Sequence, residues 1–370
     1  MKNRFWIYLI SLLLIFPAFG ITKEPPRRGL FVSVIQEPQT LSSRAAIEQL
    51  INFSKRAKID TLFVQIYRAN KTWFSSKVGD SAPAKACYKS VGEDPFRLLI
   101  NRAHAAGIEV HAWLNLLSLS QNAEAPILKK YGPGILTRKP GEKKTLEDYK
   151  IDNQYFLEPG DTRVRGELSI LIEEILRAYP ELDGLQFDYV RYPDSKPFYG
   201  YTEQNIEHFK KSTGETLVEE SNPVWKEWRR NQVTELVEIL THQARAIRPK
   251  IQVSTTGCAP YVRAYHEAFQ DWASWLDRGL VDFVTMMSYP PDRVTFEKYV
   301  SIARGTAVHF EKVNLGVGAY KLMKEPVIFE AVFHSCEKSG GRGCVVFHYG
   351  SLLENPALAD PLISEKGTGS

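Results

Sequence analysis

Cysteine is scarce in this sequence, and the spacing of the cysteines matches no metal-binding motif. The chain of 370 residues has four, Cys87, Cys258, Cys336 and Cys344. They are too sparse for a disulfide scaffold, and their spacings fit no zinc ribbon. An HExxH motif and a glycine-rich phosphate loop are also missing. We therefore expect no metal site and no cofactor, while the pairing of the cysteines stays open.

Beyond the first twenty residues, the sequence has no large net charge of either sign and no long apolar run. The formal net charge of +4 falls to +2 when Lys2 and Arg4 are left out, and no run of Lys and Arg occurs. We therefore expect no nucleic-acid partner and no transmembrane segment in the mature chain. With 44% hydrophobic and 24% charged residues, the composition excludes collagen, coiled coil and extensive disorder, and is typical of a globular enzyme.

The first twenty residues have the pattern of a secretory signal peptide. Lys2 and Arg4 precede an apolar run at 5–16, and Ala18 and Gly20 suit the small-residue positions of a cleavage site. The run is shorter than the roughly 20 residues that cross a bilayer, which disfavours an uncleaved anchor. We expect export to the periplasm or the cell exterior. The predicted organisation is a signal peptide at 1–20, a linker at 21–28, one barrel domain at 29–355 and a tail at 356–370.

Eight short β-rich runs alternate with helix-periodic segments along the chain. The runs lie at 29–35, 61–67, 107–116, 184–193, 251–260, 282–290, 313–320 and 344–350. Between them, Ala46, Leu50 and Phe53 share one face of a predicted helix, and Asp94 and Asp161 are suited to cap two others. Eight strands alternating with helices predict an α/β fold, a closed (β/α)8 TIM barrel.

Long inserted loops are predicted after strands 2, 3 and 4. One strand, one helix and two short loops need about 30 residues, and the intervals there are longer, with the excess at 72–93, 117–160 and 194–223. We expect these loops to wall the face at the carboxyl ends of the strands, where barrel enzymes hold their chemistry. The polar stretch 122–144 is expected to add to this wall and little to the core.

Asp188 is the strongest candidate for a catalytic residue. Side chains alternate along the fourth strand, so Gln186 and Asp188 are predicted to point into the barrel, with Asp188 near its upper end. A carboxylate there could act as nucleophile or as acid and base. The alternative is a structural Asp paired with Arg191 or with a backbone amide.

Glycoside hydrolysis would need a second carboxylate across the cleft. Three residues are candidates from their positions. Glu37 follows the first strand, Asp271 precedes or opens the helix after the fifth, and Asp292 follows the sixth. For Glu37 the alternative is a solvated loop residue, and for Asp271 it is a helix cap or a salt-bridge partner.

Polar and aromatic residues near the strand ends predict a sugar-binding surface. Aromatic rings stack on the apolar faces of pyranoses while amides and charged groups bind the hydroxyls. Arg68 is expected either to bind substrate or to pair with Asp188. The predicted substrate-binding residues are Gln65, Tyr67, Arg68, Trp73, Trp113, Asn115, Gln186, Arg191, Tyr192, Tyr289, Tyr320 and Tyr349.

Six motifs in order resemble the glycosyl hydrolase-like family ten of bacterial envelope barrels. They are RGLFV at 28–32, FVQIYR at 63–68, VHAWLN at 110–115, LEPG at 157–160, DGLQFDYVRYP at 183–193, and WL followed by GLVDF at 275–283. The resemblance covers roughly 27–350 and implies a (β/α)8 glycosidase acting on bacterial polysaccharide; one branch is associated with peptidoglycan strands stripped of their peptides. Two positions depart from the family pattern, Tyr189 in place of a second acid and Met286-Met287 in place of Pro-Gln.

Our leading hypothesis is an exported glycoside hydrolase whose partner is a polysaccharide or oligosaccharide and whose essential carboxylate is Asp188. The alternative is a non-catalytic carbohydrate-binding barrel, since fold does not guarantee chemistry. A second carboxyl facing Asp188 across a sugar-sized gap would favour catalysis, whereas finding only Arg68 and Asn115 there would favour binding. A metal-dependent deacetylase is a third hypothesis, disfavoured because the histidines show no metal-ligand spacing.

Overall fold

Eight parallel strands close into a barrel in the computed structural model, which describes residues 26–193 and 198–364. The predicted signal peptide therefore lies outside the described residues. The strands are β1 (Arg27–Val32), β2 (Thr61–Arg68), β4 (Glu109–Asn115), β7 (Gly184–Asp188), β8 (Gln252–Cys258), β9 (Phe283–Met287), β10 (Val313–Gly318) and β11 (Gly343–Phe347). Because β1 pairs with both β2 and β11, the sheet closes. The predicted TIM barrel is confirmed.

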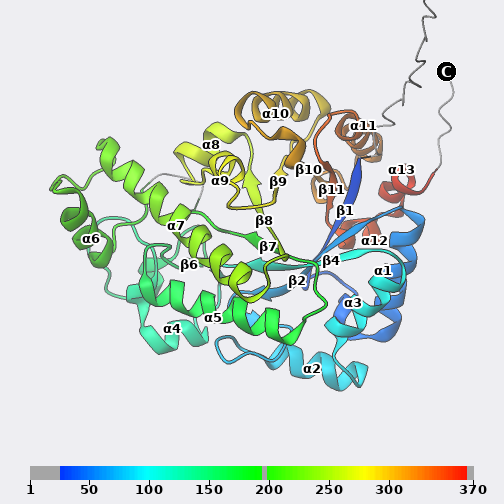
Figure 1. The fold of residues 1–370 in the computed structure, drawn as a ribbon, viewed down its shortest axis with the longest axis horizontal. Helices are drawn as coiled ribbons and strands as arrows, with labels where there is room; N and C mark the ends of the chain where they lie inside the picture. The colour runs from blue at the N-terminus through cyan, green and yellow to red at the C-terminus, as the bar shows by residue number, and fades with distance from the viewer. Residues whose placement is uncertain (1–25, 194–197, 365–370) are drawn as a thin grey trace, which may run out of the picture.

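Helices surround this barrel (Figure 1). The α-helices are α1 (Arg44–Arg56), α2 (Ala82–Val91), α3 (Pro95–Ala105), α4 (Pro126–Tyr131), α5 (Thr162–Ala178), α6 (Glu203–Thr213), α7 (Pro223–Ile247), α8 (Tyr261–His266), α9 (Trp272–Asp277), α10 (Arg293–Thr306), α11 (Pro326–Glu337), α12 (Tyr349–Glu354) and α13 (Asp360–Ile363). Helices α1, α3 and α5 start where the sequence predicted, since the side chains of Ser43, Asp94 and Asp161 accept hydrogen bonds from first-turn amides. No helix of the described chain is long and apolar enough to cross a membrane.

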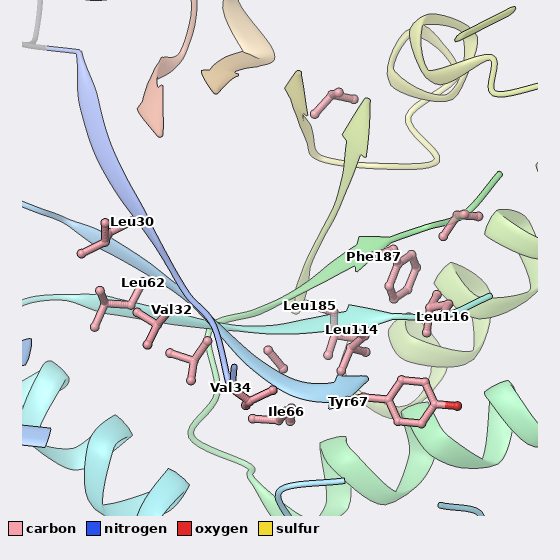
Figure 2. Packing of buried hydrophobic residues seen from close by; sticks show 14 of the residues in the cluster. Leu30, Val32, Val34, Leu62, Ile66, Tyr67, Leu114, Leu116, Leu185 and Phe187 are labelled. Carbon is pink, nitrogen blue, oxygen red and sulfur yellow. The ribbon is translucent and has the colours of Figure 1, made fainter. Parts of the chain in front are cut away.

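Side chains that alternate along the strands build two cores. Those facing outward, such as Leu62, Leu114 and Leu185, pack in the large cluster between strands and helices (Figure 2). A second cluster, made by Phe31, Phe63, Trp113, Phe283 and Val345, fills the barrel itself. The aromatic inner layer closes the barrel below its carboxyl-terminal end, so it supports a site without forming a channel.

The ends of the barrel domain differ slightly from the prediction. Strand β1 begins at Arg27, inside the expected linker. Residues 356–363, expected to be part of a tail, form a 3₁₀ turn and α13, and Leu358 and Leu362 are buried. The Leu362 carbonyl accepts a hydrogen bond from Arg28 at 3.0 Å, which fastens this segment to β1. Residues 365–370 lie outside the described residues.

A disulfide joins Cys336 at the end of α11 to Cys344 on β11, with 5.9 Å between the Cα atoms. Cys87 and Cys258 are buried and lie outside this disulfide. The pairing could not be chosen from sequence, because it depends on the packing of α11 beside the last strand.

The segment between β4 and α5 folds as a small layer of its own. It contains α4 and the antiparallel pair β5 (Ser118–Ser120) and β6 (Tyr155–Phe156). Within 122–144, expected to be a polar wall, Ala125, Ile127, Ile135 and Leu136 are buried in the main hydrophobic cluster. This stretch therefore belongs to the core, because its few apolar residues all point inward.

Candidate active site

A cavity of about 700 Å³ opens at the carboxyl-terminal end of the barrel. Every barrel strand contributes to it, through its last residues or through the loop that follows. The described lining residues are Ser33, Ile35, Arg68, Trp113, Asn115, Asp188, Tyr189, Arg191, Cys258, Ala259, Arg263, Met287, Tyr289, Pro290, Pro291, Tyr299, Tyr320, Lys321, Phe347 and His348. None comes from the predicted insertions at 72–93 and 117–160 or from the described part of the one at 194–223. The cavity therefore takes its wall mainly from shorter loops.

Asp188 lies at the floor of this cavity with both carboxylate oxygens held. The indole of Trp113 donates to Oδ2 at 2.9 Å, and the hydroxyl of Thr256 donates to Oδ1 at 2.6 Å. The amide of Tyr189, a residue with φ of 55°, also donates to Oδ1, at 2.7 Å. An ionised carboxylate accepts hydrogen bonds and donates none, so three donors match it. Only 4% of Asp188 is exposed, which leaves the cavity as its approach.

The proposed second carboxylates lie elsewhere. Glu37 is exposed on the loop after β1 and does not line the cavity. Asp271 caps α9 and accepts hydrogen bonds from the Ser274 amide and the Tyr261 hydroxyl. Asp292 caps α10, and hydrogen bonds from Thr295 lower its pKa. Asp188 is the single Asp or Glu among the described lining residues.

Arg68 reaches the cavity because β2 contains an irregularity. The pairing of β2 with β4 shifts between Gln65 and Tyr67, so that Gln65 pairs with Trp113 and Tyr67 with Leu114. Strict alternation would put Tyr67 inward; the shift turns it toward the helices, where its hydroxyl accepts from Asn70 at 3.1 Å. Burial raises the pKa of Tyr67 to about 12. Tyr67 therefore packs in the outer core, as Figure 2 shows, and Arg68 lines the cavity.

The described contacts of Arg68 include no bond to Asp188, so its guanidinium is available to a ligand. Beside it, Asn115 lines the cavity and is oriented from below by Gln65. The Gln65 amide donates to Asn115 Oδ1 at 3.1 Å, while Gln65 Oε1 accepts from the Ser33 hydroxyl at 3.1 Å. Gln65 and Gln186 are fully buried beneath the cavity, where Gln186 accepts from Ser254. Gln65 and Gln186 therefore support the residues of the cavity floor but do not line the cavity.

One wall of the cavity is aromatic. Phe347 lies 5.4 Å from Tyr289, 5.5 Å from Tyr320 and 5.8 Å from Trp113, between ring centroids. Tyr289 fits there because β10 carries glycine opposite it, since a Cβ at Gly318 would lie 2.9 Å from the Tyr289 Cβ. Burial, and then the charge of Asp188, raises the pKa of Tyr289 well above its usual value, so its hydroxyl stays protonated. Rings of this kind form a surface on which a sugar can stack.

Three rings expected at the rim are buried outside the cavity. Tyr192 is 1% exposed and donates a 2.5 Å hydrogen bond to Glu158, and its ring packs on Phe269. Tyr349 starts α12 and packs on Phe53, because β11 ends at Phe347 and His348 takes the lining position. Trp73 is part of the outer core. Arg191 does line the cavity, with its guanidinium 4.5 Å from the centre of the Tyr189 ring.

Comparison with known proteins assigns the chain to a family. A family model described as "Glycosyl hydrolase-like 10" matches residues 27–331. The chain belongs to the glycosyl hydrolase-like 10 family. Glycosyl hydrolase DigH of Escherichia coli (strain K12) is 23% identical over 345 residues, covering 83% of this chain and 76% of that protein. Glycosyl hydrolase YngK of Bacillus subtilis (strain 168) is 20% identical over 292 residues, covering 72% and 51%.

Solved structures agree with the barrel fold of this glycosyl hydrolase-like 10 chain. The PgaB (BpsB) glycoside hydrolase domain from Bordetella bronchiseptica gives a TM-score of 0.70 at 16% identity and covers 93% of this chain and 100% of that one. The catalytic domain of β-amylase from Paenibacillus polymyxa gives 0.57 at 12% identity, with 92% and 98% covered. These likenesses concern the fold, while the family identifies the chain as a glycoside hydrolase.

Several residues of the site in this glycosyl hydrolase-like 10 protein could not be recognised as site residues from the sequence. Thr256 lies within an ordinary β-rich run, and Lys321 follows Tyr320 in a loop. His348 has a buried Nδ1 without a hydrogen-bond partner among the described residues, and burial lowers its pKa, so the imidazole is neutral at neutral pH. Alternation from Val345 would have pointed to Phe347 but not to the next residue, His348, which, like the others, needed the closed barrel.

Proposed function

We propose that the mature protein is exported and hydrolyses a polysaccharide of the bacterial envelope, with peptidoglycan glycan strands as the leading candidate. The observation that carries the proposal is Asp188, held by three donors at the floor of a cavity with an aromatic wall. Hydrolysis adds water across the glycosidic bond: a carboxylate attacks the anomeric carbon or activates the water, and the proton released from the water goes to the leaving oxygen. Asp188 is the carboxylate that we assign to the anomeric carbon.

The aromatic wall supports a sugar substrate. Tyr320 is 41% exposed and Phe347 is half-buried, so both rings can give a face to a pyranose. Asn115, held by Gln65, offers its amide to a hydroxyl group. A cavity of this size, with a few oriented polar groups beside apolar rings, is typical of a ligand site.

The charge of the lining supports an acidic glycan. Four basic residues, Arg68, Arg191, Arg263 and Lys321, line the cavity together with Asp188 as the single acid among the described lining residues. Neither Arg68 nor Lys321 forms an ion pair within the described chain. A cleft dominated by positive charge attracts anionic ligands. Glycan strands stripped of their peptides carry a carboxylate on every second sugar, which fits this charge.

Export is supported by two separate features. Residues 1–20 have the composition of a signal peptide, and Cys336 and Cys344 form a disulfide, a bond that persists in oxidising compartments. Cell fractionation with N-terminal sequencing tests this proposal. We expect a mature protein that begins at Ile21 outside the cytoplasm; a full-length cytoplasmic protein would contradict it.

Product analysis with a panel of substrates tests the proposed activity. The mature protein is incubated with purified peptidoglycan glycan strands, with neutral N-acetylglucosamine oligomers and with other envelope polysaccharides, and the products are measured by mass spectrometry. We expect shorter fragments that have gained water, formed fastest from the acidic strands. Binding without any cleavage across the panel would instead favour a carbohydrate-binding protein.

A further inference from the structure

We propose that Thr256 is a positioning residue, whose hydroxyl fixes the Asp188 carboxylate in the orientation that reacts with the sugar. This inference rests on the proposed function, because it concerns how Asp188 is presented to the glycan. Thr256 stands on β8, the neighbour of the strand that carries Asp188, and its hydroxyl donates to Asp188 Oδ1 at 2.6 Å. It is 2% exposed, so it acts on the substrate through Asp188 alone.

Thr256 adds a hydrogen bond from a neighbouring strand to the oxygen that otherwise accepts only from the Tyr189 amide, the next residue along the chain. Trp113 holds Oδ2 from β4, on the opposite side of β7. The indole is itself fixed by Phe31, at 5.0 Å between ring centroids. Thr256 holds Oδ1 from β8. Asp188 therefore accepts hydrogen bonds from both neighbouring strands, and these bonds orient its two carboxylate oxygens.

Thr256 is also rigidly placed. The Gln270 side chain donates to the Thr256 carbonyl at 3.0 Å and to the Val190 carbonyl at 3.3 Å, and it accepts from the Cys258 amide at 2.8 Å. Fully buried, Gln270 ties the end of β8 to the segment that follows Asp188. Groups that hold a reacting atom in place are most effective when their own positions are locked in this way.

The role of the three donors follows from the chemistry of the carboxylate. A carboxylate that accepts from Thr256, Trp113 and the Tyr189 amide is suited to attack the anomeric carbon or to take a proton from water. Thr256 therefore helps to orient Asp188 for the basic or nucleophilic role that the proposed function gives it.

The chain offers a matched control in the adjacent residue. Thr255 lies on the same strand, is also fully buried, and donates to the Phe187 carbonyl at 3.2 Å, so it too links β8 to β7. Its side chain faces away from the cavity. Replacing either threonine by valine removes one buried hydroxyl between the same two strands, but only Thr256→Val removes a hydrogen bond to Asp188.

Steady-state kinetics on the best substrate of the panel test the proposal. We expect Thr256→Val to lower kcat roughly 10- to 100-fold, the effect of losing one hydrogen bond to a charged group, with little change in KM. Thr256→Ser, which keeps the hydroxyl, is expected to recover most of kcat. Thr255→Val should lower the melting temperature about as much as Thr256→Val and leave kcat near the wild-type value. Equal kcat values for the two valine variants would overturn the proposal.

Two further results separate the inference from the proposed function. Turnover retained by Asp188→Asn would reject the assignment of Asp188, whereas loss of turnover in Asp188→Asn with normal kcat in Thr256→Val would reject the role of Thr256 alone. Crystal structures of wild type and Thr256→Val add a measurement that needs no turnover. We expect the Asp188 carboxylate to rotate in the variant, and an unchanged position would count against a positioning role.

Discussion

Tyr192 and Tyr320 both follow the end of a barrel strand, yet their surroundings differ. Tyr320 is 41% exposed beside Phe347 in the cavity wall, whereas Tyr192 is 1% exposed and hydrogen-bonded to Glu158. Both are tyrosines in the loop just past a strand end, four residues after Asp188 and two residues after Gly318. What separates them is the chain packed above each ring. Tyr192 is covered by the segment that carries Glu158, and Tyr320 is not.

This contrast predicts different effects of the same substitution. Tyr320→Ala is expected to weaken glycan binding by about 1 to 3 kcal/mol, because it removes a stacking surface, and to leave the melting temperature nearly unchanged. Tyr192→Ala is expected to cost about 3 to 5 kcal/mol of stability, the range for a buried aromatic ring. Calorimetric titration with a soluble glycan and thermal melts measure both. A stable Tyr192→Ala variant that binds poorly would contradict the assignment of the two rings.

Glu158 is a buried carboxyl whose charge state depends on the fold. Burial raises its pKa above the ordinary value of 4.5, although the Tyr192 hydroxyl donates to Oε1. The folded protein therefore holds the proton at pH values where the unfolded chain has released it. The contribution of Glu158 to stability is full below its ordinary pKa and is lost as the pH rises through the folded-state pKa.

Glu158→Gln removes this pH dependence while keeping an oxygen that can accept from Tyr192. We expect the variant to melt at a higher temperature than wild type at pH 8, and the difference to shrink as the pH falls toward 4. Glu207→Gln, at an exposed glutamate of α6, is the control and should not change the pH profile of melting. Parallel melting profiles for wild type and Glu158→Gln would show that Glu158 stays ionised in the fold.

The inserted segment between β4 and α5 shows how an element can be misjudged from composition. Its Gly, Pro and Lys content predicts a solvated loop, but Ile135 and Leu136 are fully buried in the main cluster. The Asn122 amide also donates to the Ala69 carbonyl at 2.8 Å, which ties the segment to the loop after β2. A few buried apolar residues can fix a mostly polar segment to the core, because each buried apolar side chain contributes its own stabilising free energy.

Substitutions at two isoleucines distinguish residues that stabilise the fold from residues that contact the substrate. Ile135→Ala is expected to cost about 2 to 5 kcal/mol of unfolding free energy and to leave kcat/KM unchanged at temperatures where the variant is folded. Ile35→Ala, at a cavity residue that is 62% exposed, should do the reverse and change KM more than stability. Denaturant melts and kinetics at one temperature give the comparison. Reduced substrate affinity in folded Ile135→Ala would mean that the insertion does contribute to the cleft.

Strands were easier to predict than the side chains that meet at their ends. All eight barrel strands lie at the predicted runs, because alternating apolar residues bounded by turns are a local signal. The shift in β2 puts Arg68 rather than Tyr67 in the cavity. It cannot be read from the residues of β2 alone, since it depends on the register with β4. The same holds for β11, where ending the strand at Phe347 puts His348 in the cavity and Tyr349 in the outer core.

For the molecule as a whole, barrel closure gathers distant residues into one site. Asp188 was found from the sequence because an inward carboxylate at a strand end is conspicuous. Thr256 and Phe347 look like ordinary strand residues until the closed barrel brings Phe347 to the cavity and Thr256 against Asp188. The net positive charge of the chain is small, yet basic residues dominate the described lining, a clustering that composition cannot show.

The kinetic comparison of wild type with Asp188→Asn on purified glycan strands is the most direct test of the account. The amide keeps the size of the side chain but can neither attack the anomeric carbon nor activate water, so kcat/KM is expected to fall by at least about 10³-fold. The circular dichroism spectrum should stay that of the folded protein. A folded Asp188→Asn variant that cleaves the strands at the wild-type rate would contradict the central claim that this carboxylate performs the hydrolysis.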